Sequence, residues 1–360
     1  PIFPSASVGW RISEEPFFGN LKKNIDNVKL RLSYGSLGNQ QVGYYDYIQT
    51  INTNGTMNYI FGDQKKGSYA SVSDPNSADP TWETVSTWNV GLDLGFLNNR
   101  LNLTADAYVR DTKGMQTSGK KLPGAYGANE PKQNAANLRT KGWELMLTWN
   151  DAFKLANKPF RYNLSVGLAD NTSEITKFDN PSKILSDYYV GQKLGDIWGY
   201  VVDGLFRTDE EAANYNVDQT AVNFVINTAQ VNPGLHAGDM KFVDLDGDHT
   251  ISSGSNTADD PGDRKIIGNS LPRYTYSIQG GFDWYGFDFS IYLQGVGHQD
   301  WYPGTNSVFF WGPYARPYSS FIPRDFLSQV WSPENPDAYF PRPIGYLALG
   351  NNRSLGVVND

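Results

Sequence analysis

Three aspartates at alternate positions carry the clearest chemical signal in the sequence. Asp244, Asp246 and Asp248 lie in the segment Phe242-Val-Asp-Leu-Asp-Gly-Asp-His-Thr-Ile-Ser252, at the first, third and fifth positions of an EF-hand-type loop. Thr250 falls at the seventh position, where the main-chain carbonyl serves as a ligand. Because Ca²⁺ takes roughly six to eight oxygen ligands, this spacing predicts a structural calcium site in a loop.

The segment departs from the EF-hand pattern at two positions. His249 occupies the sixth position, which normally takes glycine, and Ser255 occupies the twelfth, where a bidentate acid belongs. Asp259 and Asp260 are candidates to supply the missing acid. The alternative is an Asx-rich turn, in which aspartate side chains accept hydrogen bonds from their own backbone. The spacing alone leaves both interpretations open.

A second group of residues could contact a ligand or a partner protein. Its members are Trp301, Tyr302, Trp311, Tyr314 and Arg316, in an aromatic and proline-rich segment near the end of the chain. Exposed rings can stack on sugar faces or on peptide side chains, and the guanidinium of Arg316 could hold a carboxylate. Packing of the segment on itself or against another protein is the alternative that clustered apolar surface favours.

The composition excludes several classes of protein. The chain has no Cys, which rules out a disulfide scaffold and a thiolate metal site, and a net charge of −8 argues against nucleic acid as a partner. The acids Asp209, Glu210 and Glu211 suit the solvated start of a short helix, since a glycosidase pair needs a pocket and a fixed separation. We find no nucleophile or phosphate-loop motif, and we expect no enzyme.

Period-two alternation of apolar and polar residues recurs along the chain. In residues 101–110, Leu101, Leu103, Ala105, Ala107 and Val109 alternate with polar or charged neighbours. The runs that alternate in this way, or read as strands, are 4–12, 30–39, 88–96, 101–110, 143–149, 160–168, 274–284 and 287–294. No apolar run approaches the ~18 residues of a membrane helix. We therefore predict an all-β chain.

The links between these runs alternate in length. Short links at 13–27, 97–100, 151–159 and 285–286 alternate with long ones at 37–83, 112–140, 170–271 and 295–360. In an antiparallel up-and-down sheet this puts tight turns at one end and long loops at the other, as in outer-membrane barrels. A soluble β-sandwich is the alternative. A transmembrane barrel wide enough for a nutrient needs about 22 strands and a plug in its lumen, so this chain would form part of one.

Several segments resemble one known family. They are 30–39, 79–100 with 108–113, 138–145, and 238–244 with 263–269, and in that order they are similar to the SusC/RagA-like TonB-dependent outer-membrane transporters of Bacteroidetes. The resemblance implies that residues 1–360 are a C-terminal part of the barrel, without the plug, the N-terminal domain and the last strands. Residues 170–271 and 295–360 would then be long extracellular loops, and Asp263 would stand in the place of the final acid of the calcium loop.

The same resemblance implies a function. Such proteins import oligosaccharides or peptides across the bacterial outer membrane, under a SusD-like lipoprotein lid and with energy from the TonB–ExbB–ExbD complex. The barrel would contact outer-membrane lipid, and Ca²⁺ would be its only expected cofactor. Two alternatives remain: a SusC-like subunit that has only a structural role in an outer-membrane complex, and a soluble secreted glycan-binding β-protein. The sequence does not distinguish glycans from peptides as the ligand.

Overall fold

The computed structural model describes residues 2–19, 21–39, 48–60, 66–75, 81–118, 123–222, 235–303, 310 and 322–342. The chain divides into two compact units. The first comprises Pro1–Pro181, Tyr188–Leu194 and Pro272–His298, and the second comprises Ser182–Asp187, Gly195–Leu271 and Gln299–Asp360. Each unit is described separately below.

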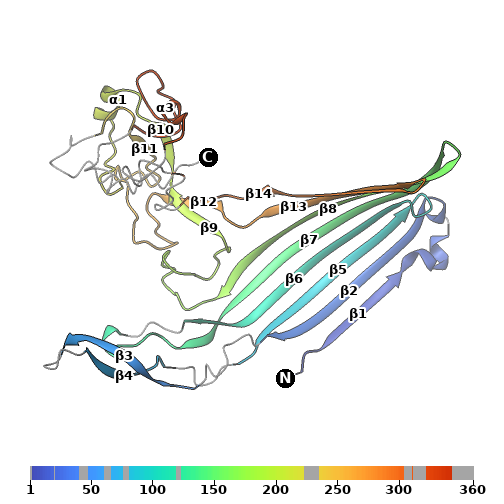
Figure 1. Ribbon diagram of the computed structural model, residues 1–360, viewed down its shortest axis with the longest axis horizontal. Helices are drawn as coiled ribbons and strands as arrows, with labels where there is room; N and C mark the ends of the chain where they lie inside the picture. The colour runs from blue at the N-terminus through green and yellow to red at the C-terminus, as the bar shows by residue number, and fades with distance from the viewer. Residues whose placement is uncertain are drawn as a thin grey trace. The chain divides into compact units, whose positions relative to one another are not determined.

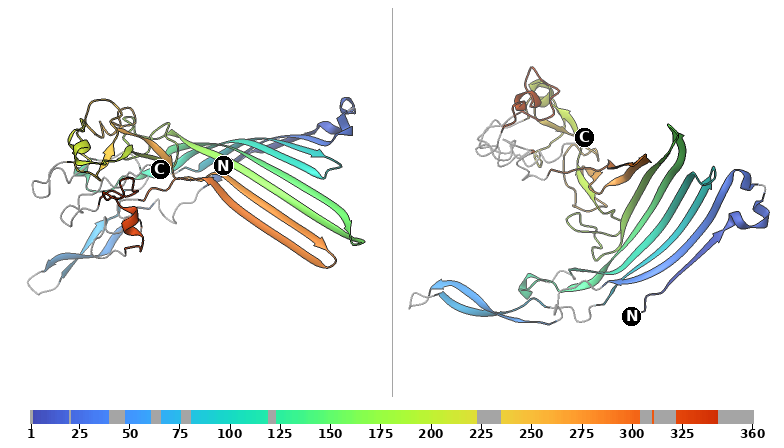
Figure 2. Two further views of the ribbon diagram at one scale, coloured as in Figure 1. Left: turned by 90° about the horizontal axis from the view of Figure 1, so that it is seen from above. Right: turned by 45° about the vertical axis from the view of Figure 1, so that its right-hand side comes forward.

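The first unit is built on one antiparallel sheet of eight strands. These strands are β1 (Ser5–Arg11), β2 (Ile25–Asn39), β5 (Glu83–Phe96), β6 (Leu101–Ser118), β7 (Lys132–Leu155), β8 (Lys158–Lys177), β13 (Arg273–Trp284) and β14 (Phe287–His298). They lie side by side in the order of the chain, as one curved layer (Figures 1 and 2). Each of the eight runs expected from the sequence forms a strand, and the up-and-down order is confirmed.

Three links at one end of the sheet are short because their residues adopt left-handed backbone angles. Between β13 and β14, Tyr285 and Gly286 have φ values of 50° and 86°, and between β7 and β8, Ala156 and Asn157 have 49° and 61°. Positive φ at both central residues matches the right-handed twist of the flanking strands. The link between β1 and β2 is a run of short 3₁₀ turns, η1 (Ile12–Glu14), η2 (Pro16–Phe18) and η3 (Leu21–Lys23).

The links at the other end are longer and carry structure of their own. A hairpin of β3 (Ile51–Ile60) and β4 (Lys66–Val72) lies between β2 and β5, and η4 (Gly124–Tyr126) lies between β6 and β7. The expected loop 112–140 is mostly strand, since β6 and β7 stay paired through register shifts around Met115. A shift of register by one residue moves the following side chains to the other face of the sheet. The alternation of apolar and polar residues that predicts a strand is therefore interrupted there.

One face of the sheet is apolar and uncovered among the described residues. A single register row crosses seven strands with Val28, Leu94, Leu103, Leu147, Val166, Ile278 and Leu293 directly opposite one another. Within that row Leu147 is 43% exposed and Leu293 is 52% exposed. A contiguous apolar surface of this kind is rare on soluble monomers and is typical of a face that contacts lipid or protein.

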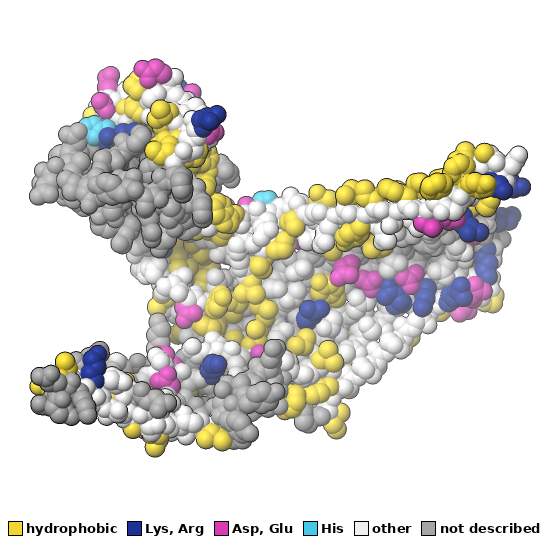
Figure 3. Space-filling view, in the orientation of Figure 1, with side chains coloured by type: hydrophobic (Ala, Val, Ile, Leu, Met, Phe, Trp, Pro, Cys, Tyr) yellow, Lys and Arg dark blue, Asp and Glu magenta, His cyan; other side chains and the backbone are white. Residues whose placement is uncertain are grey.

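The opposite face is polar. The next register row holds Lys29, Asp93, Thr104, Met146, Gly167, Ser277 and Gln294. Beside it, the guanidinium of Arg31 bridges Asp93 at 2.9 Å and Asp106 at 2.8 Å, which joins three neighbouring strands. It lies flat over Gly91, where any side chain would meet the guanidinium carbon at 2.4 Å. Acidic and basic side chains lie together over the middle strands in Figure 3.

The second unit has its own hydrophobic core. Its described residues include two strand pairs, β9 (Asp196–Tyr200) with β12 (Arg264–Asn269) and β10 (Val202–Leu205) with β11 (Met240–Phe242), and the short helices α1 (Asp209–Ala213) and α3 (Phe326–Gln329). Its buried cluster is Val222, Met240, Phe242, Ile251, Val330 and Phe340. These residues come from both expected long loops, 170–271 and 295–360, so parts of the two loops pack together.

Two further observations concern helices. The side chain of Thr208 accepts a hydrogen bond from the amide of Glu211 and caps α1, so the acidic run 209–211 occupies a helix start as expected. No helix in the described part of the chain is long and apolar enough to cross a bilayer.

Candidate functional site

The acidic loop is held at both ends by the core of the second unit. Phe242 precedes the loop and Ile251 follows its third aspartate, and both side chains are fully buried. Between them the backbone is left-handed at Gly247, with φ of 81°, and at His249, with φ of 65°. The loop therefore makes the sharp turn of an EF-hand at its sixth position with histidine in place of glycine, at a conformational cost of about 1–2 kcal/mol.

Three of the predicted metal ligands converge. Asp244, Asp246 and Asp263 each offer one carboxylate oxygen, and these three oxygens lie within 4.8 Å of one another. Ca²⁺ binds oxygens at about 2.3–2.6 Å, so two ligands of one ion can be about 5 Å apart at most. The separation of these carboxylates fits a single calcium ion.

Asp263 is the buried acid of this group, and hydrogen bonds from the backbone hold its carboxylate in place. Its carboxylate is fully buried and accepts hydrogen bonds from the amides of Leu245 and Ser252, each at 2.7 Å. The competing candidates are engaged elsewhere: Asp259 pairs with Lys183 at 2.7 Å, and Asp260 accepts from the amide of Ser255 at 3.0 Å. The family resemblance implies Asp263 as the final acid of the loop, and the structure places Asp263 close to Asp244 and Asp246.

Asp248 is not among the converging carboxylates, and the main-chain carbonyl of Thr250 stays a predicted ligand. One oxygen of Asp248 accepts the amide of Thr250 at 2.7 Å, which is the Asx turn of the alternative interpretation. Asp244 also accepts from the backbone, from Gly247 at 2.7 Å and from His249 at 2.9 Å. The loop thus has features of both the Asx-rich turn and the calcium loop. Its aspartate side chains accept hydrogen bonds from the backbone, and three carboxylates converge.

The convergence of charge changes the pKa of Asp246. The amide of Asp248 lowers this pKa, but partial desolvation and the negative charges of Asp248, Asp263 and Asp244 outweigh it, and the pKa of Asp246 is raised. For Asp244, burial favours the neutral form, yet the amides of His249 and Gly247 hold its pKa below the ordinary value. The ionised form of Asp246 is therefore disfavoured in the loop without a cation.

Two of the predicted ligand-contact residues line a cleft in the second unit. Trp301 is 67% exposed and Tyr302 is 40% exposed. The cleft is lined by Asp196, Ile197, Trp198, Ser270, Gln299, Asp300, Trp301 and Tyr302. Trp311, Tyr314 and Arg316 lie outside the described residues. The sequence does not indicate Asp196, Trp198 and Asp300 as lining residues. The pairing of β9 with β12 brings Asp196 to Asn269, and Asp300 accepts a hydrogen bond from the amide of Asn269 at 2.6 Å.

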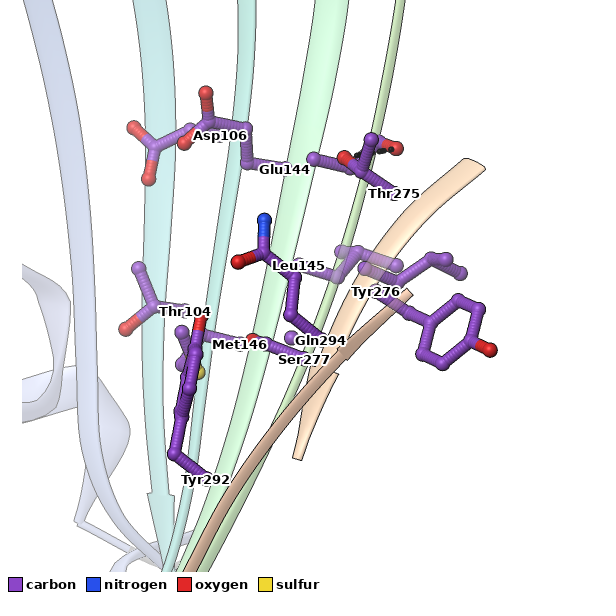
Figure 4. Close-up of a pocket in the computed structure, with 13 residues that line it drawn as sticks. Thr104, Asp106, Glu144, Leu145, Met146, Thr275, Tyr276, Ser277, Tyr292 and Gln294 are labelled. Carbon is purple, nitrogen blue, oxygen red and sulfur yellow. Dashed lines mark hydrogen bonds between the residues drawn. The ribbon is translucent and has the colours of Figure 1, made fainter. Parts of the chain in front are cut away.

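The polar face of the sheet holds a second hollow that the sequence analysis did not identify. Asp106 on β6 and Glu144 on β7 are direct register partners, and their carboxylates lie on the same side of the sheet (Figure 4). Thr104, Met146 and Gln294 lie beside them. Asp106 is paired with Arg31, so the hollow combines one neutralised acid with one exposed acid.

These features define a class of protein. An up-and-down antiparallel sheet with one continuous apolar face, one polar face, tight turns at one end and long connections at the other is the wall of a membrane β-barrel. Among the described residues the sheet is open, with β1 and β14 as its edges.

Comparisons with known proteins agree with this class. No protein-family model matches the sequence. The chain is 31% identical over 304 residues to the TonB-dependent receptor SusC of Bacteroides thetaiotaomicron, covering 81% of this chain and 27% of that protein. It is 29% identical over 312 residues to the TonB-dependent receptor P39 of Formosa agariphila, covering 80% of this chain and 28% of that protein.

A solved structure shows the same fold. The RagAB peptide importer in its 'open-open' state superimposes with a TM-score of 0.64 at 19% sequence identity, over 94% of this chain and 33% of that chain. The chain thus spans about a quarter to a third of the length of the proteins it matches. It belongs to the SusC/RagA-like TonB-dependent receptors, and the expected all-β barrel class is confirmed. These relatives are named as receptors and importers, not as enzymes, which agrees with the expectation from the sequence.

Proposed function

We propose that this chain forms part of the barrel wall of a TonB-dependent importer in the bacterial outer membrane. The observation that carries the proposal is the two-faced sheet, in which a row of seven apolar residues alternates with a polar row. Lipid would cover the apolar face, and the polar face would line the lumen. The relatives named as TonB-dependent receptors support the same function.

The partners follow from this proposal. The TonB–ExbB–ExbD complex would supply energy, and a SusD-like lipoprotein would cover the extracellular mouth. The cargo would be an oligosaccharide or a peptide. The solved neighbour is named a peptide importer, and its likeness to this chain concerns the fold.

Growth and uptake of a deletion strain test this function. We expect the strain to lose growth on one class of nutrient, either defined glycans or peptides, and to regain it with the intact gene. Uptake of that labelled nutrient should also stop when the proton-motive force is collapsed. Normal growth on every nutrient would favour the purely structural subunit, and recovery of the protein in the soluble fraction without detergent would favour the soluble glycan-binding protein.

The acidic loop is proposed to hold a structural Ca²⁺. The oxygens of Asp244, Asp246 and Asp263 have the required spacing, and the raised pKa of Asp246 reflects partial desolvation together with neighbouring negative charge that a cation would neutralise. Main-chain carbonyls and water would complete the coordination. Because the loop begins and ends in the core of the second unit, a bound ion would stabilise that unit.

Asp246→Asn should have opposite effects without and with calcium. In EGTA at neutral pH the variant should melt at a higher temperature than the wild type. A carboxyl with a raised pKa disfavours folding once it ionises, and the amide removes that charge. With Ca²⁺ the order should reverse, since binding at about 100 times Kd adds about 2.7 kcal/mol to the wild type alone. Thermal unfolding of the detergent-purified protein measures both.

Asp259→Asn is the matched control for this experiment. Asp259 is a nearby acid that pairs with Lys183 and lies outside the converging group. We expect this variant to keep the full calcium-dependent gain. If Ca²⁺ raises the melting temperature of wild type and Asp246→Asn equally, the proposed calcium site is wrong.

A further inference from the structure

The apolar face of the sheet carries a row of aromatic side chains at its tight-turn end. One register row next to the turns of β7–β8 and β13–β14 consists of aromatic residues alone, namely Phe153, Phe160, Trp284 and Phe287. This aromatic row lies on the same face as Leu147, because side chains alternate along a strand in steps of two. Phe153 is 51% exposed and Phe287 is 68% exposed, so no described residue covers the row at these positions.

A hydrogen bond and ring stacking hold the aromatic row in place. The indole Nε1 of Trp284 donates to the carbonyl of Leu155 at 3.2 Å, which ties the turn of β13–β14 to the turn of β7–β8. The ring of Phe160 packs on that of Phe153 with centroids 5.0 Å apart and stacks on Phe282 at 5.3 Å. A hydrocarbon chain that lies on these rings would meet a preformed surface, which lowers the entropic cost of binding.

A lysine lies beside this row, one register position nearer the turn. Lys158 is the register partner of Leu155 and shares the face of Phe160. It is exposed, and its ammonium lies 5.1 Å from the centroid of the Tyr285 ring. No carboxylate of the described residues forms an ion pair with it. Basic side chains lie beside hydrophobic ones at this end of the sheet in Figure 3, and the ammonium of Lys158 can accept an anionic partner.

The position of the aromatic row along β7 fits a membrane interface. Towards the other end of the same face, Trp143 is the first aromatic residue of β7, and the charged residues Lys141 and Arg139 precede it at alternate positions. The span from Trp143 to Phe153 matches the roughly 9–11 residues with which a tilted strand crosses the hydrocarbon layer. Aromatic girdles flank that layer at both interfaces. If lipid covers the apolar face, Lys158 lies at the level of the headgroups.

From this arrangement we infer that Lys158 and the aromatic row bind an anionic phospholipid. The lipid phosphate accepts hydrogen bonds from the ammonium of Lys158, and an acyl chain lies along the rings. Free phosphate could not use the rings, and a zwitterionic lipid brings an ammonium of its own that competes for the phosphate. The inference rests on the proposed barrel wall and names the class of lipid that this part of the wall selects.

A second cation at the tight-turn end provides an internal comparison. The guanidinium of Arg100 lies 6.0 Å from the ring centroid of Trp149, so it also lies over an aromatic ring. It differs from Lys158 because it pairs with Asp151 at 3.2 Å. Its charge is already balanced, and we expect no preference for anionic lipid at this position.

Quenching of a local fluorophore by brominated lipids tests the inference. The full-length protein, with any cysteine elsewhere replaced, is labelled at Phe287→Cys, the most exposed position of the row, and reconstituted in vesicles. The vesicles contain phosphatidylglycerol and phosphatidylcholine with identical chains, and one or the other is brominated. We expect an about fivefold preference for phosphatidylglycerol, since one lysine near an anionic lipid surface contributes about 1 kcal/mol. Lys158→Ala should abolish the preference, and Lys158→Arg should keep it.

Two controls define the readout. Arg100→Ala should leave the preference unchanged, and a label at Val90→Cys, on the apolar face of β5, should report none. Equal quenching by both lipids at position 287, or a preference that survives Lys158→Ala, would overturn the inference. A preference that millimolar phosphate abolishes, but sodium chloride of equal ionic strength does not, would indicate a free-phosphate site and overturn it too. No quenching by either lipid at positions 287 and 90 would instead reject the lipid-covered face, and with it the proposed function.

Discussion

Leu147→Arg should prevent stable assembly of the protein in the outer membrane. Leu147 lies in the middle of the apolar register row, between Leu103 on β6 and Val166 on β8. If lipid covers this row, an arginine near the midplane of the bilayer costs about 2–4 kcal/mol, which is a large share of the stability of a barrel. The amount of heat-modifiable, folded protein in the outer-membrane fraction measures the effect.

Met146→Arg is the matched control. Met146 is the adjacent residue on the same strand, it points to the polar face, and it is 43% exposed, the same fraction as Leu147. An arginine there would lie beside the acids Asp106 and Glu144, and we expect a change of less than about 0.5 kcal/mol. If Leu147→Arg and Met146→Arg reduce assembly equally, the proposal that lipid covers only the apolar face of the sheet is wrong.

Asp263→Ala should unfold much of the second unit. The carboxylate of Asp263 is fully buried, and it accepts the amides of Leu245 and Ser252. Its removal leaves two partly buried donors without their partner at about 1–2 kcal/mol each, so we expect a loss of about 2–4 kcal/mol for this unit. Limited proteolysis and amide hydrogen exchange at residues 240–252 report the loss directly.

This effect should persist in EGTA, because it depends on hydrogen bonds within the protein and not on an ion. Asp260→Ala is the control. Asp260 also accepts a backbone amide, from Ser255, but its side chain is exposed, so water can replace it. Equal protease resistance of Asp263→Ala and the wild type would show that the buried carboxylate does not organise the loop.

The strands could be predicted from the sequence because their signal is local. Residues 101–110 alternate strictly, and each side of that alternation maps to one face of β6. The turn at Tyr285-Gly286 was likewise readable, since glycine suits the left-handed angle there. The extension of β6 to Ser118 was not, because the irregular pairing at Met115 breaks the alternation.

The site was predictable only in part because its contacts are distant in the sequence. Asp244 and Asp246 follow from spacing within one loop. Asp263 lies beyond the twelve positions of an EF-hand loop that starts at Asp244, so only the family resemblance indicates it from the sequence, and the structure brings it to the other two acids. The hydrophobic core brings Ile251 to Val330 and Phe340, and the cleft of the second unit brings Asp196 to Asp300. Both depend on packing between distant segments, which the alternation of residues and the composition do not encode.

Spin labels along β7 test the central claim most directly. Residues 1–360 contain no Cys, so single cysteines at each position from Glu144 to Trp149 can be labelled once any cysteine elsewhere in the protein is replaced, and the protein can be reconstituted in lipid vesicles. We predict that collision with oxygen, which concentrates in lipid, is high at Leu145, Leu147 and Trp149. Collision with a water-soluble nickel reagent should instead be high at Glu144, Met146 and Thr148. Equal access of the nickel reagent to both sets of positions would contradict a lipid-covered face.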